Sequence, residues 1–218
     1  MTALKSWSVI LLAAGESRRM QGQNKLLLEV DNVPLLRRTA MRLTNYGRAE
    51  GVGFKEVIVV TGHEMTAAHS QLTGLNVRAV HNAGYSQGQM SSVTRGLSEL
   101  KLPVDGVVIF LADLALIDLD DLRAIHTGFS QMKRDVLVPT FEGIRGNPIV
   151  IAYDKVSEIL ATGQNLGCKH LIDKQPEVVE QLEMSNDHCL VDIDTPEAYE
   201  AVYTRIKTKS ISDMVDQC

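Results

Sequence analysis

The feature that most constrains the fold is a short apolar run near the N-terminus that ends in three small residues. Residues 9–12 read Val-Ile-Leu-Leu and are followed at once by Ala13, Ala14 and Gly15. An uninterrupted apolar run of this length is typical of a strand that is buried on both faces within a parallel sheet. The small residues after it let a ligand approach the backbone closely. We therefore expect a buried strand followed by a loop that contacts a ligand.

Cationic side chains follow this loop. Arg18, Arg19 and Lys25 all lie within ten residues of Gly15. Arginine offers phosphate a planar fork and lysine offers it a point charge, while backbone N–H groups of the turn supply further donors. The spacing is not that of a P-loop, and Gly15 and Gly22 alone do not make a dinucleotide fingerprint. The stretch predicts a phosphate-binding loop of another type; a strand followed by a basic surface loop is the structural alternative.

Composition limits the class of protein. The chain has 218 residues, which is enough for one α/β domain with a sizeable core. Its formal net charge of −5 favours neither nucleic acid nor a membrane surface as the main partner. No apolar run approaches the length of a membrane span. Cys168, Cys189 and Cys218 show no metal-ligand spacing and no disulfide framework, so we expect a reducing, cytoplasmic setting.

Short apolar segments alternate with helical patterns along most of the chain. This alternation predicts a three-layer α/β/α sandwich around a mostly parallel, Rossmann-like central sheet. We expect a single domain over residues 1–206, closed by a helix that ends near Ile206, and a frayed or partner-binding tail over residues 207–218. The further strands are expected at residues 26–30, 57–60, 77–80, 107–111, 135–139, 149–152, 178–182 and 189–193.

Two aspartates lie directly after predicted strands. Asp113 follows the strand expected at 107–111, and Asp194 follows the one expected at 189–193. Ligands of open α/β sheets bind beyond the carboxyl ends of the strands, so these side chains are expected at one edge. Carboxylates are also the protein ligands that Mg²⁺ prefers. Each residue has a structural alternative, since Asp113 can be a turn residue and Asp194 or Thr195 can cap the last helix.

A polar, glycine-rich segment over residues 82–97 leads into a predicted helix that starts near Ser91. Gln89, Ser91 and Ser92 offer hydrogen-bonding side chains, and the helix N-terminus offers free N–H groups. The segment is therefore a candidate for reading a nucleotide base and ribose. The alternative is that Ser91 or Ser92 only caps the helix.

These motifs together resemble the nucleotidyltransferase-like family of MobA-like NTP transferases, and most of all the branch that contains the molybdenum cofactor cytidylyltransferases. The resemblance spans roughly residues 7–205, and it implies a fold of the nucleotide-diphospho-sugar transferase type. The first motif follows the signature L-A-[AG]-G-x-S-x-R-M-x-x-x-K, with one more residue before the lysine. The residues that match it are Leu12-Ala13-Ala14-Gly15, Ser17, Arg19-Met20 and Lys25-Leu26-Leu27.

The resemblance also implies a role for each motif. The implied nucleotide-binding residues are Leu12, Ala13, Ala14, Gly15, Ser17, Arg19, Lys25, Gly62, Gly88, Ser91 and Ser92. The implied catalytic residues are Arg19, Lys25 and Asp113, and the implied Mg²⁺ ligands are Asp113 and Asp194. Arg145, Gly146, Asn147 and Pro148 resemble the family's acceptor-side segment, although a hairpin turn explains them almost as well.

The implied reaction is transfer of CMP from CTP to a phosphorylated acceptor, with release of pyrophosphate. The Leu-Ala-Ala-Gly form of the motif goes with CTP, and the implied acceptor is a molybdopterin-type pterin that is passed on to a molybdoenzyme partner. The chain departs from the family pattern at Ala115, where the family has proline, and at Gln164 and Lys169. Two alternatives therefore stay open. One is a related enzyme with a sugar phosphate or another phosphorylated acceptor, and the other is a non-catalytic cofactor-binding or delivery protein.

Overall fold

The fold is built around one eight-stranded sheet in a computed structural model, which describes residues 3–48, 51–161 and 175–215. The strand order is β10-β7-β9-β6-β1-β4-β5, with β8 paired to β7. All neighbouring strands are parallel except β9, which is antiparallel to β6 and β7, and β8. The strands are β1 (Trp7–Ala13), β4 (Val57–Thr61), β5 (Arg78–His81), β6 (Gly106–Leu111), β7 (Val136–Phe141), β8 (Ile144–Arg145), β9 (Ile149–Ala152) and β10 (Val179–Glu183).

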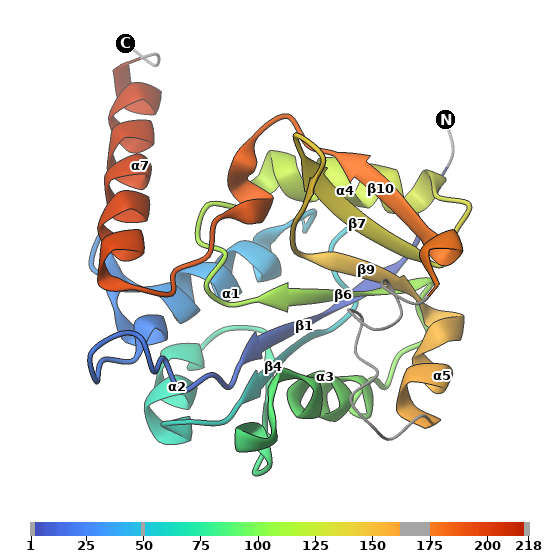
Figure 1. The fold of residues 1–218 in the computed structure, drawn as a ribbon, viewed down its shortest axis with the longest axis horizontal. Helices are drawn as coiled ribbons and strands as arrows, with labels where there is room; N and C mark the ends of the chain where they lie inside the picture. Colours follow the sequence, from blue (N-terminus) through green and yellow to red (C-terminus); the bar gives the residue numbers. More distant parts are fainter. Residues whose placement is uncertain (1–2, 49–50, 162–174, 216–218) are drawn as a thin grey trace.

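Helices cover both faces of the sheet and complete the predicted three-layer sandwich (Figure 1). α1, α2 and α4 pack on one face, and α3 and α5 pack on the other. A two-stranded hairpin of β2 (Glu29–Val30) and β3 (Val33–Pro34) precedes α1. The helices are α1 (Leu35–Asn45), α2 (Met65–Leu72), α3 (Gln89–Leu97), α4 (Leu119–Gln131), α5 (Val156–Ala161) and α7 (Pro196–Val215).

The first strand shows why the sequence requires this arrangement. All seven residues of β1 are buried. Val9 and Leu11 belong to the core beneath α1 and α4, whereas Ile10 and Leu12 belong to the core beneath α3 and α5. Alternate side chains of a strand point to opposite faces, so a strand with apolar residues on both faces needs a cover on each side.

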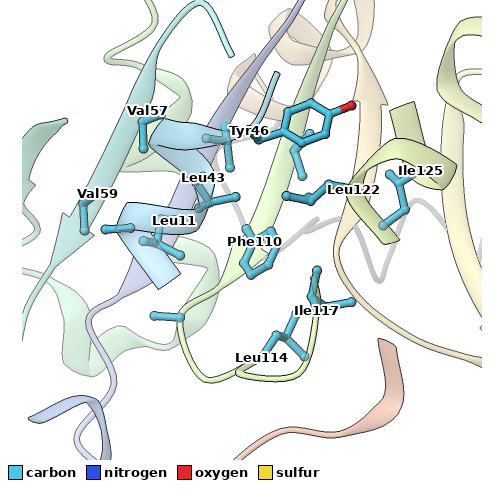
Figure 2. Close-up of a cluster of buried hydrophobic side chains, with 14 of the residues drawn as sticks. Leu11, Leu43, Tyr46, Val57, Val59, Phe110, Leu114, Ile117, Leu122 and Ile125 are labelled. Atoms are coloured by element: carbon cyan, nitrogen blue, oxygen red, sulfur yellow. The ribbon is translucent and has the colours of Figure 1, made fainter. Parts of the chain in front are cut away.

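The larger of the two cores that flank the sheet lies beneath α1, α2 and α4. Figure 2 shows Leu11 and Phe110 of the sheet beside Leu43 of α1 and Leu122 of α4. Each fully buried aliphatic side chain of this kind stabilises the fold by about 1.5–3 kcal/mol. The packed layers fix the positions of the strand ends, from which the loops of the candidate site emerge.

Three predicted elements differ from the structure. The strand expected over 189–193 is wrong, because residues 187–190 form a 3-10 helix that begins with a cap in which Asn186 accepts from the His188 N–H. Residues 25–27 also form a 3-10 helix, so the strand expected over 26–30 shrinks to β2. α7 continues to Val215 instead of ending near Ile206, since no glycine or proline interrupts it after Pro196.

The departures at Gln164 and Lys169 lie outside the described residues. Among the described helices, none is both long and apolar enough to cross a membrane.

Candidate active site

A cleft of about 550 Å³ opens at the carboxyl ends of β1 and β6. This is the edge at which ligands of open α/β sheets bind. The loop after β1, the segment before α3, and the chain just before α7 all contribute to it. The cleft is lined by Leu12, Ala14, Gly15, Glu16, Ser17, Arg18, Arg19, Lys25, Leu26, Tyr85, Ser86, Gly88, Gln89, Ser92, Leu111, Asp113, Asp192 and Asp194.

The loop after β1 is folded back on itself by local hydrogen bonds. Ser17 has a positive φ of 52°, its carbonyl accepts from the Met20 N–H, and its Oγ accepts from the Lys25 N–H at 3.1 Å. Met20 is only 1% exposed and anchors the loop in the core. Asn24 caps the 3-10 helix Lys25–Leu27 by accepting from Leu26 N–H. These contacts fix the backbone from which the Lys25 side chain enters the cleft.

Lys25 joins two carboxylates that are far apart in the sequence. Its Nζ donates to Asp113 Oδ2 at 2.5 Å and to Asp194 Oδ1 at 2.7 Å. Arg19 donates to the other oxygen of Asp194. Asp192 completes the group, because ligand atoms of all three aspartates lie within 4.8 Å of one another. When all three aspartates are ionised, two cations face three carboxylates, and the group keeps one uncompensated negative charge.

The environment shifts the pKa values of Asp113, Lys25 and Asp194. Burial raises the pKa of the Asp113 carboxyl, although the Lys25 ammonium acts in the opposite direction. Burial alone would lower the pKa of Lys25, but the charges and hydrogen bonds of Asp113 and Asp194 outweigh it and raise that pKa. Burial also disfavours ionisation of Asp194, yet Lys25 and Arg19 hold its pKa below the usual value. Lys25 therefore stays protonated at neutral pH and Asp194 stays ionised.

The carboxylate group fits a divalent cation. Among the described residues, the buried Asp113 Oδ1 has no hydrogen-bond partner. A buried carboxylate oxygen without a partner is costly, and a bound cation would offset that cost. Hard divalent cations take carboxylate oxygens together with phosphate oxygens, which the open cleft leaves room for. Asp113, Asp192 and Asp194 are the residues that could hold such an ion.

At the end of the cleft next to α3, the described residues of the segment that precedes and begins this helix contribute uncharged side chains, of which Tyr85 shapes the wall. A Cβ on Gly62 would lie 2.6 Å from Tyr85 Cβ and 2.8 Å from Ala14 Cβ, so only glycine lets these two residues approach each other. Ala14 and Tyr85 both line the cleft, whereas Gly62 lies behind them. Gln89 and Ser92 add hydrogen-bonding groups at this end. Size and hydrogen bonding can therefore select a ligand here.

The two serines of the segment before α3 have different places. Ser91 Oγ donates to the carbonyls of Gly84 and Gly88 and does not line the cleft. Ser92 lines it and accepts from Asn82 Nδ2. The alternative of simple helix capping is wrong for both, because Gly88 is the cap residue of α3 and no side chain caps its first turn in the described structure.

The predicted site residues divide into two groups. The cleft brings together Leu12, Ala14, Gly15, Ser17, Arg19, Lys25, Gly88, Ser92, Asp113 and Asp194. The predicted residues that do not line it are Ala13, Gly62, Ser91, Arg145, Gly146, Asn147 and Pro148. Gly146 instead packs on the 3-10 helix at residues 187–190, where a Cβ would lie 2.5 Å from the Cys189 carbonyl oxygen. The acceptor-side role of residues 145–148 therefore stays a prediction.

Arg18 and Gln89, whose side chains the sequence marks as possible ligand donors, also line the cleft. The cleft residues that were given no individual role from the sequence are Glu16, Leu26, Tyr85, Ser86, Leu111 and Asp192. Asp192 carried a readable signal. It stands two residues before Asp194, with the fully buried Ile193 between them. In an extended segment, side chains two residues apart lie on the same side of the chain, so Asp192 is expected on the same side as Asp194.

The chain belongs to the MobA-like NTP transferase domain family, whose sequence profile matches residues 9–179. This match confirms the family resemblance and, at that level, the class of nucleotidyltransferases.

Individual relatives are more distant. The bifunctional IPC transferase and DIPP synthase of Rubrobacter xylanophilus is 36% identical over 107 residues, which are 47% of this chain and only 23% of that protein. A nucleotidyl transferase from Methanothermobacter thermautotrophicus has a similar structure, with a TM-score of 0.77 and 22% identity, covering 94% of this chain and 99% of that chain. CMP:2-keto-3-deoxy-manno-octonic acid synthetase complexed with CTP gives a TM-score of 0.73 at 12% identity and covers 94% and 99%. These structures establish the likeness of fold.

Proposed function

We propose that this protein transfers CMP from CTP to a phosphorylated acceptor in a reaction that depends on a divalent cation, Mg²⁺. The observation that carries this proposal is the position of Lys25 between Asp113 and Asp194, at the end of a small-residue loop that opens on the cleft. Cations next to carboxylates at a strand end suit a triphosphate that arrives with its metal ion.

The residues of the cleft divide the work between them. The backbone of the loop at Gly15, with Arg19 and Lys25, would hold the triphosphate. Asp113, Asp194 and Asp192 would hold the Mg²⁺, which when bound neutralises phosphate charge. The uncharged end beside Ala14 and Tyr85 would take the base, with Gln89 and Ser92 as hydrogen-bonding partners.

In the proposed reaction a phosphate oxygen of the acceptor attacks the α-phosphorus of CTP. A new P–O bond forms while the bond to the β-phosphate oxygen breaks, and pyrophosphate leaves with that electron pair. The protein needs no covalent intermediate, because positioning and charge neutralisation supply the catalysis. The Leu-Ala-Ala-Gly form of the loop and the CTP complex of a protein with a similar fold support CTP as the donor.

Two classes of acceptor remain for this reaction. A molybdopterin-type pterin follows from the resemblance of the loop motifs, and a molybdoenzyme would then be the partner that receives the product. A sugar phosphate or another phosphorylated acceptor is the alternative, and the relative from Rubrobacter xylanophilus, which is named for IPC transfer and DIPP synthesis, supports an acceptor other than a pterin. Both acceptors would use the same three aspartates, Asp113, Asp192 and Asp194, and would differ in the group that approaches them from the open side of the cleft.

The experiment is a thermal-shift titration with CTP, GTP, ATP and UTP, each with and without Mg²⁺. Saturation to 100 times Kd stabilises a protein by about 2.7 kcal/mol, which raises the Tm of a chain of this size by about 5–10 °C. We expect this shift with CTP and Mg²⁺ and a smaller one with the other nucleotides. A larger thermal shift with another nucleotide would identify that nucleotide as the donor in place of CTP. No shift with any triphosphate would contradict the proposal and favour a delivery protein.

A further inference from the structure

We infer that Lys25 competes with a divalent cation for Asp113 and Asp194, so that the cleft takes up the cation together with a triphosphate and only weakly alone. The inference rests on the proposed function and names how that site couples its two ligands. Lys25 is on this account a positioning residue with two alternative anionic partners.

The geometry of the ammonium supports competition. Nζ lies 2.5 Å from an oxygen of Asp113 and 2.7 Å from an oxygen of Asp194, which places it between the two carboxylates. Divalent cations bind carboxylate oxygens at about 2.0–2.6 Å, so an ion bridging the same two oxygens would fall on nearly the same point. The ion and the ammonium cannot both occupy it. An ion that bridges these two oxygens would therefore require the Lys25 side chain to move.

The surroundings determine where Lys25 can move. Its side chain is only 12% exposed, so leaving the carboxylates does not simply return the charge to water. The ammonium needs another anion nearby. The other carboxylates of the cleft are Glu16, which pairs with Arg18, and Asp192, which would hold the same cation, so a bound triphosphate is the anion that can take the ammonium. A divalent cation alone displaces Lys25 without giving it a new partner. A cation that arrives with a triphosphate gives it one.

The loop permits this movement because only the side chain has to change. The backbone at Lys25 is held by the bond from its N–H to Ser17 Oγ and by the Asn24 cap, while the neighbouring Leu26 is 5% exposed. Arg19, the second cation on Asp194, has a side chain that is 68% exposed and can leave easily. The lysine side chain is a flexible four-carbon stem, so its charge can move while the backbone stays in place.

The expected consequence is reciprocal coupling. A triphosphate raises the affinity for the cation and the cation raises the affinity for the triphosphate by the same factor. Removal of the ammonium should strengthen binding of the cation alone and weaken binding of the triphosphate. These two effects have opposite signs, which a simple loss of structure would not produce.

The test measures Mn²⁺ binding by the electron paramagnetic resonance signal of the free ion, with and without CTP and without any acceptor. The variants are Lys25→Met and Lys25→Gln. The control is Lys155→Met, since Lys155 also bridges two carboxylates, Asp135 at 3.4 Å and Glu158 at 3.2 Å, but lies outside the cleft. We expect the Lys25 variants to bind Mn²⁺ alone at least about fivefold more tightly than the wild type, the lower end of usual coupling between ligands. The control should match the wild type.

The outcomes separate this inference from the proposed function. Unchanged or weaker Mn²⁺ binding by folded Lys25 variants, with CTP binding intact in the wild type, overturns the competition and leaves the function standing. Tighter Mn²⁺ binding by the variants in a protein that never binds CTP supports the competition and overturns the function. If neither variant folds, the wild type decides alone: equal Mn²⁺ affinity with and without CTP contradicts the coupling.

Discussion

Two clusters in this protein look alike in composition and differ in what their oxygen atoms contact. The cleft cluster is Asp113, Asp192 and Asp194, and the scaffold cluster is Asp118, Asp121 and His188. In each cluster, one ligand atom per residue lies within 4.8 Å of the others. The closeness of their side chains alone does not distinguish the two clusters.

In the scaffold cluster, other groups of the fold donate hydrogen bonds to the carboxylate oxygens. Asp121 is 3% exposed, and its oxygens accept from the Asp118 N–H at 2.9 Å, His188 Nδ1 at 2.7 Å and Asn186 Nδ2 at 2.9 Å. Asp118 in turn accepts from the N–H groups of residues 120 and 121, which closes a capping box at the start of α4. These residues hold α4 to the segment at 186–190.

The cleft cluster is the opposite case. Its buried Asp113 Oδ1 has no hydrogen-bond partner in the described part of the chain, and its other bonds go to cations at the wall of a cleft. The difference teaches that a site is marked by a carboxylate oxygen that the fold leaves without a hydrogen-bond partner in a residue that lines a cleft. A cluster whose oxygens all accept hydrogen bonds from the fold stabilises the fold, whereas a cluster with an oxygen that lacks a partner can bind a ligand.

The largest expected effect is on activity at the cleft cluster. Asp113→Asn keeps the volume of the side chain but removes the charge that holds Lys25 and a cation, so pyrophosphate release from CTP should fall about 100-fold or more. Circular dichroism should show a folded protein. Activity within tenfold of the wild type would place the chemistry elsewhere.

The matching change in the scaffold cluster should act on stability. Asp121→Ala leaves His188, Asn186 and the N-terminus of α4 without their shared acceptor, which should cost about 2–4 kcal/mol of unfolding free energy in urea titration. Turnover per folded molecule should stay unchanged. Asp120→Ala is the control, because Asp120 stands in the same turn, is exposed, and pairs only with Arg123 among the described contacts; a surface change of this kind costs under about 0.5 kcal/mol. Equal losses for both variants would break the comparison.

Two glycines repeat the contrast on a smaller scale. Gly62→Ala places a Cβ 2.6 Å from Tyr85 Cβ, and such overpacking costs about 1–3 kcal/mol. For Gly15→Ala, no heavy atom of the described residues other than its chain neighbours lies within 4 Å of the added Cβ, so stability should change by less than about 0.5 kcal/mol. Nucleotide affinity should nevertheless fall, because the methyl group obstructs the phosphates. Full CTP affinity in Gly15→Ala would argue against this loop as the phosphate site.

The smallest expected effect is a pH dependence that belongs to the scaffold. Burial lowers the pKa of His126 below 6.5, although its bond to the Lys5 carbonyl acts the other way. His126 keeps its ordinary pKa in the unfolded chain. Below pH 6.5 the unfolded chain therefore binds more protons than the folded protein, and the free energy of unfolding decreases as the pH is lowered. The stabilisation is complete above pH 6.5 and is lost as the pH drops through the lower folded pKa, by about 1.4 kcal/mol per pH unit at most.

Urea midpoints at pH 7.5 and 5.5 measure this dependence. The wild type should lose more stability than His126→Gln over that interval, whereas a change of the exposed His81 to Gln should leave the wild-type difference intact. The same loss in all three proteins would show that another group titrates.

The sequence predicted the elements whose signals were local and unambiguous. A wholly apolar run left no doubt about β1, and the rule that ligands lie beyond strand ends placed Asp113 at the cleft. Asp194 lies there too, although the strand expected before it does not form. The failure at 189–193 has a physical cause. Its apolar residues suit a strand, but the Asn186 cap and the bond from Asn147 N–H to the Cys189 carbonyl at 2.8 Å favour a 3-10 helix.

Other parts of the site depended on contacts that no local pattern encodes. Tyr85 enters the cleft wall because Gly62, twenty-three residues earlier on another strand end, leaves room for it. The bridge from Lys25 to Asp194 joins residues at opposite ends of the chain. Asp192 was readable from its alternation with Ile193, and the interpretation of that segment as a strand and a cap obscured it.

The most direct test of the account is calorimetric titration of CTP into the wild type and into Asp113→Asn, each with Mg²⁺ and with EDTA. The account predicts binding by the wild type with Mg²⁺, and at least about tenfold weaker binding both with EDTA and in the variant, a difference of about 1.4 kcal/mol or more. CTP binding that ignores both the cation and Asp113, or no binding at all, would contradict it.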